Sequence, residues 1–212
     1  MANLETWMRL TCFKAYDIRA KLGADLNEDI AYRIGRSVAQ TLQATQVVIG
    51  FDARETSPKL AKAAARGVCA AGANVIDIGL SGTEEMYWAV TSQQACAGIE
   101  VTASHNPIDY NGMKIVKRGS KPLSEEEFCA IQDLAERASF AAPLGEGRRT
   151  NRAAEARRAY VEKLMHFVKP KDLKHLKIVV NAGNGAAGPS FDVLVDALSA
   201  SGASTDFIRV HH

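Results

Sequence analysis

Residues 47–78, VVIGFDARETSPKLAKAAARGVCAAGANVIDI, have the pattern of one strand–helix–strand unit. The first five residues form a compact apolar run, which is typical of a buried strand. Ser57 and Pro58 then suit the N-cap and the first position of a helix, and Gly72 suits its end. A second apolar run at 75–78 follows as the next strand. Because a helix between two strands usually connects parallel neighbours in one sheet, this unit predicts an α/β fold.

The same alternation of strand and helix patterns continues on both sides of this unit. Asn27 suits the N-cap of a helix that runs to about residue 42. Ser124 with Glu127 makes a capping box for a helix that runs to about residue 138. Further helices are expected at 82–93, 153–167 and 189–201, and further strands at 98–101, 113–116, 177–181 and 205–210. The predicted fold class is α/β, with a mostly parallel mixed sheet covered by helices.

Residues 140–151 lack this periodic pattern, since Ala, Pro, Gly and Arg replace it. We expect a domain boundary there. The chain then divides into a first α/β domain, residues 1–150, and an incomplete second α/β domain, residues 151–212. The second unit has only two expected strands, so we expect uncovered apolar strand and helix faces that favour self-association.

Charge and composition argue against several classes of partner. The 212 residues include 26 basic and 24 acidic side chains, for a formal net charge of +2, without long charged runs. This balance gives no electrostatic reason to expect a nucleic-acid or membrane partner. No apolar run reaches the roughly 20 residues that a membrane span needs. The four cysteines include no CxxC pair and no nearby histidine at zinc-ligand spacing. We therefore expect a cytoplasmic protein.

The segment 102–107, TASHNP, directly follows an expected strand. In open α/β sheets, ligands bind beyond the carboxyl ends of the strands. Phosphoryl transfer needs a hydroxyl nucleophile, cations near the charged oxygens and a group that moves the proton. Ser104 supplies a hydroxyl. His105 and Lys114 supply positive or protonatable groups, together with Arg19 from the N-terminal segment. From spacing alone, an ordinary loop remains the alternative, because Asn-Pro initiates turns and Ser and His are common beside it.

TASHNP, followed by DYNGMK at 109–114, resembles the active-site signature of the α-D-phosphohexomutases, the bacterial phosphomannomutase/phosphoglucomutase family. Three more segments resemble motifs of this family: FKAYDIR at 13–19, GFDAR at 50–54 and NAGNGAAG at 181–188. The segment LSGTEE at 80–85 is similar to the bacterial phosphomannomutase branch. The resemblance covers the first domain and part of the second domain of a four-domain family.

The resemblance implies an enzyme that interconverts hexose 1-phosphate and hexose 6-phosphate. Ser104 matches the serine that is phosphorylated and passes its phosphoryl group to the sugar, which gives a bisphosphorylated intermediate. Lys114 matches a lysine that acts in acid–base chemistry at the sugar hydroxyl. Arg19 and His105 complete the implied catalytic set. The implied substrate-binding residues are Tyr16 and Asn106.

The resemblance also implies Mg²⁺, bound through the Ser104 phosphate and three aspartates of an Asp-Gly-Asp-x-Asp-Arg loop. The 212 residues contain no such loop and no counterpart of the family's later sugar and phosphate motifs. We therefore expect the isolated chain to be inactive. The implied partners are mannose or glucose 1- or 6-phosphate and a hexose 1,6-bisphosphate. The alternative is a stand-alone, non-catalytic α/β module that binds a phosphorylated ligand or a partner protein.

Three smaller features carry expectations of their own. Asp52 and Arg54 follow a strand, and we expect them to form an ion pair that braces the site. The glycine-rich stretch at 183–188 lacks the lysine of a nucleotide-binding loop, so we expect a structural turn. Ala20 stands where the family motif has glycine, and it would displace Arg19 slightly if that position needs an unusual backbone angle.

Overall fold

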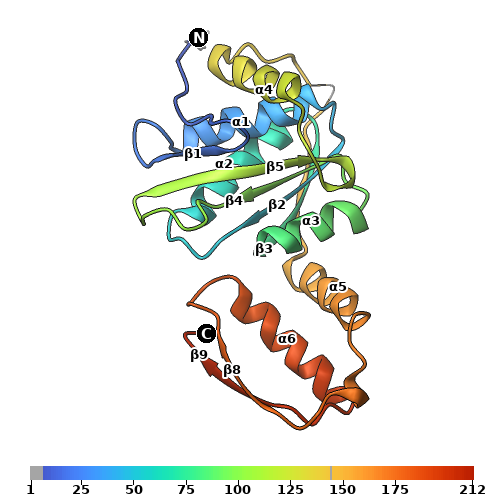
Figure 1. The fold of residues 1–212 in the computed structure, drawn as a ribbon. Coiled ribbons are helices and arrows are strands. Elements are labelled where there is room, and N and C mark those ends of the chain that lie inside the picture. The colour runs from blue at the N-terminus through green and yellow to red at the C-terminus, as the bar shows by residue number, and fades with distance from the viewer. Residues whose placement is uncertain (1–6, 144) are drawn as a thin grey trace.

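The computed structural model describes residues 7–143 and 145–212; residues 1–6 and Leu144, which belong to the expected first domain, lie outside it. The larger sheet has the strand order β1-β5-β4-β2-β3-β7, and β6 pairs with β5 (Figure 1). Its strands are β1 Ile18–Lys21, β2 Gln46–Phe51, β3 Asn74–Leu80, β4 Ala97–Val101, β5 Tyr110–Lys117, β6 Lys121–Pro122 and β7 Arg149–Asn151. Strands β4, β2, β3 and β7 pair in parallel, whereas β5 is antiparallel to β1, β4 and β6. The mixed α/β sheet expected from the sequence is confirmed.

Helices cover both faces of this sheet. The helices are α1 Glu28–Thr41, α2 Ser57–Ala70, α3 Thr83–Ser92, α4 Glu125–Arg137, α5 Ala153–Met165 and α6 Ala187–Ala200, with short 3₁₀ turns η1 Arg118–Ser120 and η2 Pro170–Asp172. Helices α1, α2 and α4 lie on one face and α3 lies on the other (Figure 1). Helix α5 contacts α3 and β3, and it also contacts α6.

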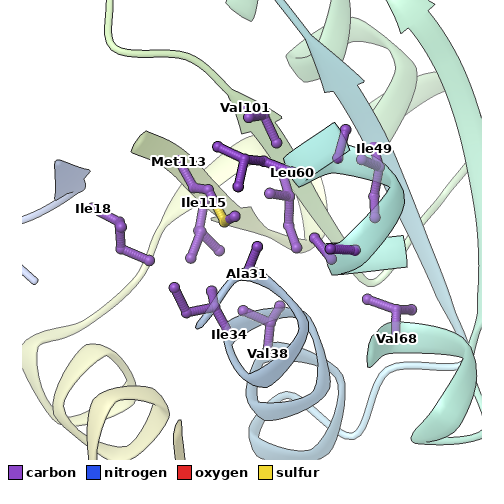
Figure 2. Close-up of a cluster of buried hydrophobic side chains, with 14 of the residues drawn as sticks. Ile18, Ala31, Ile34, Val38, Ile49, Leu60, Val68, Val101, Met113 and Ile115 are labelled. Carbon is purple, nitrogen blue, oxygen red and sulfur yellow. The ribbon is translucent and has the colours of Figure 1, made fainter. Parts of the chain in front are cut away.

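The buried side chains of β2 show why both faces are covered. Val47 and Ile49 belong to the main core, whereas Val48 belongs to a second cluster under α3. This arrangement follows from the alternation of side chains across a strand. In the main core, Ile34 and Val38 of α1 lie below the strand residues (Figure 2). A continuous apolar run is therefore the expected pattern for a strand with helices on both sides.

Helices α1 and α2 approach each other at two glycines. A Cβ atom built on Gly67 would overlap the main-chain carbonyl oxygen of Tyr32, and one built on Gly35 would overlap the carbonyl oxygen of Ala64. Only glycine allows the two backbones to pack at this separation. The Ala-rich sequence of α2 lets the same helix lie close to the sheet.

The smaller sheet consists of β8 Lys177–Asn181 and β9 Asp206–Val210, which pair in parallel. Helix α6 connects them and lies beside both strands (Figure 1). Several apolar side chains of this region are exposed: Leu176, Ile178, Val179 and Ile208. No helix in the described residues is both long and apolar enough to cross a membrane.

Two of the expected helix caps are confirmed and a third was placed wrongly. Asn27 accepts a hydrogen bond from the Ile30 amide, and Ser124 forms the full capping box with Glu127. The N-cap of α2 is Thr56 rather than Ser57, and its side chain makes no capping hydrogen bond. Ser57 is instead fully buried, and its hydroxyl binds side chains of the site described below.

Strands β1, β6 and β7 were not expected from the sequence. Strand β7 lies in the stretch 140–151 and extends the larger sheet by pairing with β3 at Asn151 and the two residues before it. Arg149 also forms an ion pair with Asp77 of β3. The chain then enters α5 after a single residue, Arg152, whose amide donates to the Asp77 carbonyl.

Candidate functional site

Ser104 lies in the loop between β4 and β5 with its side chain exposed. Its backbone is left-handed, with φ of 53°, which is uncommon for a residue with a side chain. The Ser104 amide donates to Oγ1 of Thr102 at 2.9 Å, and this bond holds the turn. The Ser104 hydroxyl lies 3.3 Å from Nδ1 of His105. The loop thus presents a hydroxyl to solvent beside an imidazole.

Arg19 reaches this loop from β1. Its Nη1 donates to the Ala103 carbonyl at 2.9 Å and to Oδ1 of Asn106 at 2.5 Å. Its Nη2 pairs with Asp17 at 2.6 Å, while its Nε is buried without a hydrogen-bond partner in the part of the chain that the structure describes. Ala20 lies within β1 and is not among the residues with positive φ. Alanine therefore causes no backbone strain there, and the condition for a displaced Arg19 is not met.

Arg54 makes the most extensive contacts with the loop, and the sequence analysis missed them. Its Nη1 donates to the carbonyls of Pro107 at 2.7 Å and Tyr110 at 3.1 Å. Its Nη2 donates to the carbonyls of Ser104 at 3.0 Å and Asn106 at 2.5 Å. One guanidinium therefore binds four main-chain oxygens of a single loop. The available signal was an arginine three residues beyond the end of β2, the strand that pairs with the strand before TASHNP.

The expected ion pair between Asp52 and Arg54 is confirmed, with 3.4 Å between Oδ2 and Nε. The other carboxylate oxygen, Oδ1, accepts the Ser57 hydroxyl at 2.6 Å and the Arg54 amide at 3.1 Å. The Ser57 oxygen in turn accepts Nδ2 of Asn111 at 2.9 Å. Ser57 and Asn111 are fully buried. The carboxylate that holds Arg54 is thus fixed to both α2 and β5.

Lys114 and Tyr16 lie farther from this network. Lys114 is half-buried in β5, where it is the antiparallel partner of Glu100 on β4. Tyr16 is 81% exposed in the segment before β1. Neither side chain takes part in a hydrogen bond or ion pair found among residues 7–143 and 145–212. The structure therefore brings Arg19, Asn106, Ser104 and His105 together, whereas Lys114 and Tyr16 make no hydrogen bond or ion pair with them in the described residues.

A cavity of about 390 Å³ opens beside Ser104. It is lined on one side by the ends of β2 and β4 and by the Ser104 loop, and on the other side by the turn before α6. The lining residues are Asp52, Ala53, Arg54, Thr102, Ser104, Asn106, Ile108, Gly183, Asn184, Gly185 and Ala186. Loops from the two sheets therefore share one cavity: residues 52–54 and 102–108 come from the larger sheet, and residues 183–186 come from the smaller sheet.

The stretch at 183–188 begins with a tight turn, as expected. Gly183 has φ of 60° and Asn184 has φ of 55°, and the Gly185 amide donates to the Ala182 carbonyl at 2.9 Å. The Asn184 amide donates to the His211 carbonyl, which ties the turn to the end of β9. The sequence analysis did not anticipate that this turn would face Ser104 across the cavity.

Glu100 lies under this region, on β4. It is 1% exposed, and Oε2 accepts the Ser81 hydroxyl at 3.2 Å. Burial raises the pKa of Glu100 well above its ordinary value of 4.5, and the nearby Asp52 adds to this effect, while the bond from Ser81 opposes it. The adjacent position on β2 is Gly50, where a Cβ atom would overlap both Ser81 and Glu100. The glycine makes room for a buried carboxyl group.

The described residues offer a poor fit to a protein-bound magnesium ion. They contain no group of three or more His, Cys, Asp or Glu side chains that could hold a metal. Ser104 alone, even when phosphorylated, supplies phosphate oxygens but no carboxylates. Mg²⁺ usually has one or two carboxylates in addition to substrate phosphates. We therefore derive no chemical step through a metal ion.

Comparisons with known proteins show what this arrangement resembles. Residues 10–142 match the family model for phosphoglucomutase/phosphomannomutase, alpha/beta/alpha domain I. The chain is 49% identical to a phosphomannomutase of Salmonella typhimurium over 206 residues and 45% identical to a phosphohexose mutase of Xanthomonas campestris, also over 206 residues. The alignments cover 96% and 97% of the chain but only 45% and 44% of these relatives. The chain therefore spans about half the length of the curated relatives that it matches.

Solved structures give the same likeness. The crystal structure of a phosphoglucomutase/phosphomannomutase family protein from Burkholderia thailandensis superposes with a TM-score of 0.79 at 33% identity. The match covers 94% of this chain and 43% of that one. A phosphomannomutase structure from Thermus thermophilus superposes with a TM-score of 0.77 at 21% identity, which supports the fold alone.

Proposed function

Because this chain belongs to the phosphoglucomutase/phosphomannomutase family, we propose that it is the nucleophile-bearing part of a phosphohexomutase. The proposed reaction interconverts hexose 1-phosphate and hexose 6-phosphate through a phosphoserine at Ser104 and a bisphosphorylated sugar. The observation that carries this proposal is the exposed Ser104 hydroxyl at the edge of a cavity shared by two sheets. Relatives of this chain are named phosphomannomutase and phosphohexose mutase, and these names support phosphoryl transfer as the reaction of that hydroxyl.

In the proposed reaction, the bond between phosphorus and the Ser104 oxygen breaks as a bond forms between phosphorus and a sugar hydroxyl oxygen. Lys114 takes up the proton that the sugar hydroxyl releases, and it returns a proton in the reverse step. Transfer in the other direction rephosphorylates Ser104 from the other phosphate of the bisphosphate. Proton transfer by a positioned side chain typically contributes a factor of about 10²–10⁴ to the rate.

The loop surroundings suit a serine that carries two negative charges. Arg19 and Arg54 both place guanidinium groups against the loop, so they offset part of the phosphate charge. His105 adjoins the hydroxyl, and Asn106 lines the cavity where the proposed sugar phosphate binds. In this proposal Tyr16 joins Asn106 in substrate binding. Tyr16 is 81% exposed, so the described residues leave its ring open to a ligand.

The relatives named phosphomannomutase favour mannose 1- and 6-phosphate as substrates, with the glucose phosphates as the second choice and a hexose 1,6-bisphosphate as the activator. Bound Mg²⁺ would neutralise charge on the Ser104 phosphate. The division into residues 1–150 and 151–212 is part of the proposal, as are the cytoplasmic location and the inactivity of these 212 residues alone.

A second candidate is a non-catalytic module that binds a phosphorylated ligand. The observation in its favour is that Lys114, the proposed proton carrier, makes no hydrogen bond or ion pair with Ser104 or its neighbours in the described structure, and instead lies opposite Glu100 in the sheet. Such a module would bind hexose phosphate in the same cavity, but Ser104 would not become phosphorylated.

The deciding experiment is intact-mass and fragment spectrometry after incubation of the whole protein with glucose 1,6-bisphosphate and Mg²⁺. We expect one added phosphate on Ser104 and none in the Ser104→Ala variant. The half-buried Ser120 on η1 provides an internal comparison, because it does not line the cavity. Phosphate on Ser120 or elsewhere with Ser104 unmodified would reject the proposed mechanism, and binding without any modification would favour the module.

A further inference from the structure

We propose that Arg54 is a positioning residue that sets the backbone of the Ser104 loop for phosphoryl transfer. That Arg54 holds the loop conformation is inferred from the structure alone. That this conformation serves phosphoryl transfer rests on the proposed function. Arg54 donates to the carbonyls of Ser104, Asn106, Pro107 and Tyr110 over distances of 2.5–3.1 Å. Its side chain is only 11% exposed, so the guanidinium itself is largely removed from water.

Arg19 and the Ser104 amide also make hydrogen bonds that hold this conformation, but Arg54 binds more of the main-chain oxygens than Arg19 does. Within the loop, the Asn106 amide donates to the Ala103 carbonyl, and the Tyr110 amide donates to the Pro107 carbonyl. Ser104 meanwhile adopts a left-handed backbone, which is unfavourable for a residue other than glycine. The bonds from Arg54 offset this strain, because hydrogen bonds from a charged donor are stronger than those between neutral groups.

Arg54 is itself held in one orientation. Its Nε faces Oδ2 of Asp52, while Oδ1 of Asp52 is bound by the Ser57 hydroxyl. The Ser57 oxygen also accepts a hydrogen bond from the side-chain Nδ2 of Asn111, which lies in β5. The anchor of the arginine therefore comes from the end of β2 and from buried groups on α2 and β5. Through Arg54, the Ser104 loop is thus fixed to the end of β2, to α2 and to β5.

The donor count separates this role from phosphate binding. A guanidinium has five N–H groups. In Arg54 one N–H faces Asp52 and the other four serve the four loop carbonyls. No donor is left for a substrate phosphate, although the residue lines the cavity. Arg54 therefore makes no hydrogen bond to a substrate phosphate, and beyond its charge it acts on the reaction through the position of Ser104.

A lysine cannot reproduce this arrangement. Its ammonium is a point charge with three donors, whereas the planar guanidinium presents a fixed fork that spans four acceptors. Arg54→Lys therefore keeps the charge and loses the geometry, and Arg54→Met loses both. Lys21→Met is the matched control, because Lys21 forms a single exposed ion pair with Asp109 in the same loop.

The test combines hydrogen exchange of the whole protein with steady-state kinetics. In Arg54→Lys and Arg54→Met, we expect amides of residues 103–110 to exchange at least about 10-fold faster, while β2 and β3 amides keep their rates. We expect kcat to fall on the order of 100-fold, because small misplacements of a reacting group have effects of this size. KM should change less than threefold, and Lys21→Met should leave both measurements unchanged.

Each alternative outcome has a distinct meaning. Unchanged loop exchange in Arg54→Lys and Arg54→Met, or acceleration spread evenly over β2 and β3, would overturn the positioning role. A raised KM with unchanged kcat would make Arg54 a substrate-binding residue instead. Absence of Ser104 phosphorylation in the unmodified protein would reject the proposed function, while the exchange data would still decide the role of Arg54 in the loop.

Discussion

The Ser190 hydroxyl donates a 2.5 Å hydrogen bond to Oε1 of Glu85, and both side chains are buried. The bond joins α3, on the larger sheet, to α6, on the smaller one. Burial raises the pKa of Glu85, while the bond from Ser190 and the charge of Arg157 oppose the rise. This contact therefore couples the packing of the two sheets to the ionisation of one carboxyl group.

Ser190→Ala should lower the free energy of unfolding by about 1–3 kcal/mol, because it leaves a buried carboxyl oxygen without its donor. The loss should grow with pH, since the ionised form of Glu85 depends on that donor most. Urea unfolding at pH 5 and pH 8 measures both effects. Ser201→Ala is the control, because the exposed Ser201 hydroxyl binds only the Ala197 carbonyl of its own helix. Equal small losses in both variants would contradict the coupling.

Glu100→Gln should make the protein more stable relative to the unmodified chain as the pH rises. Burial raises the pKa of Glu100 above 4.5, so the folded state holds this proton more tightly than the unfolded chain does. The stability that this tighter proton binding contributes to the folded state is fully present below about pH 4.5, and it is lost as the pH rises through the folded-state pKa of Glu100. Within that window the difference should grow by about 1.4 kcal/mol per pH unit.

The measurement for Glu100 is a series of urea unfolding curves between pH 4 and pH 8. The exposed Glu55 provides the control variant, Glu55→Gln. A difference between Glu100→Gln and the unmodified chain that stays constant over this range would show that Glu100 ionises normally.

Gly67→Ala should lower the free energy of unfolding by about 1–3 kcal/mol, because the new methyl group overlaps the Tyr32 carbonyl of the facing helix. This penalty exceeds the gain of about 1 kcal/mol in helix propensity. Gly82→Ala is the control, since its Cβ would meet its nearest neighbour at an ordinary 3.6 Å. Thermal unfolding compares the two. A Gly67→Ala variant with unchanged stability would mean that α1 and α2 can separate without cost.

Lys114→Ala should reduce turnover by on the order of 100-fold if Lys114 moves the proton of the sugar hydroxyl. Substrate affinity should change less, because the residue acts mainly in the transition state. A coupled assay for hexose 6-phosphate formation by the whole protein measures kcat and KM. The exposed Lys121 on β6 provides the control, Lys121→Ala. Unchanged turnover would remove Lys114 from the proposed mechanism.

The sequence predicted best the features that depend on neighbouring residues. The caps at Asn27 and Ser124 and the buried strand β2 have local signals, and all three are confirmed. Strand β7 could not be recognised, because its three residues are exposed and become a strand only by pairing with β3. The N-cap of α2 was misplaced because the half-buried carboxylate of Asp52 binds the Ser57 hydroxyl.

For the candidate site, the sequence predicted which residues carry the proposed chemistry but not what holds them. The motif TASHNP identified Ser104, and the structure places Arg19 against its loop. The acceptors of Arg54 are main-chain carbonyls, which every residue has, so no side-chain pattern could reveal them. The cavity was likewise unpredictable, because it depends on how the turn at 183–186 meets the other sheet.

The carbonyls that bind Arg54 lie 50 to 56 positions later in the chain, and this separation bears on the order of folding. Contacts between distant residues form only after the entropy of closing the intervening loop has been overcome. A short peptide containing TASHNP lacks the arginine, so its serine has the conformational freedom and reactivity of any other. During synthesis Ser104 thus gains its geometry only after β2, β4 and β5 have assembled. A partly folded chain contains the TASHNP motif but lacks the loop conformation of the proposed nucleophile.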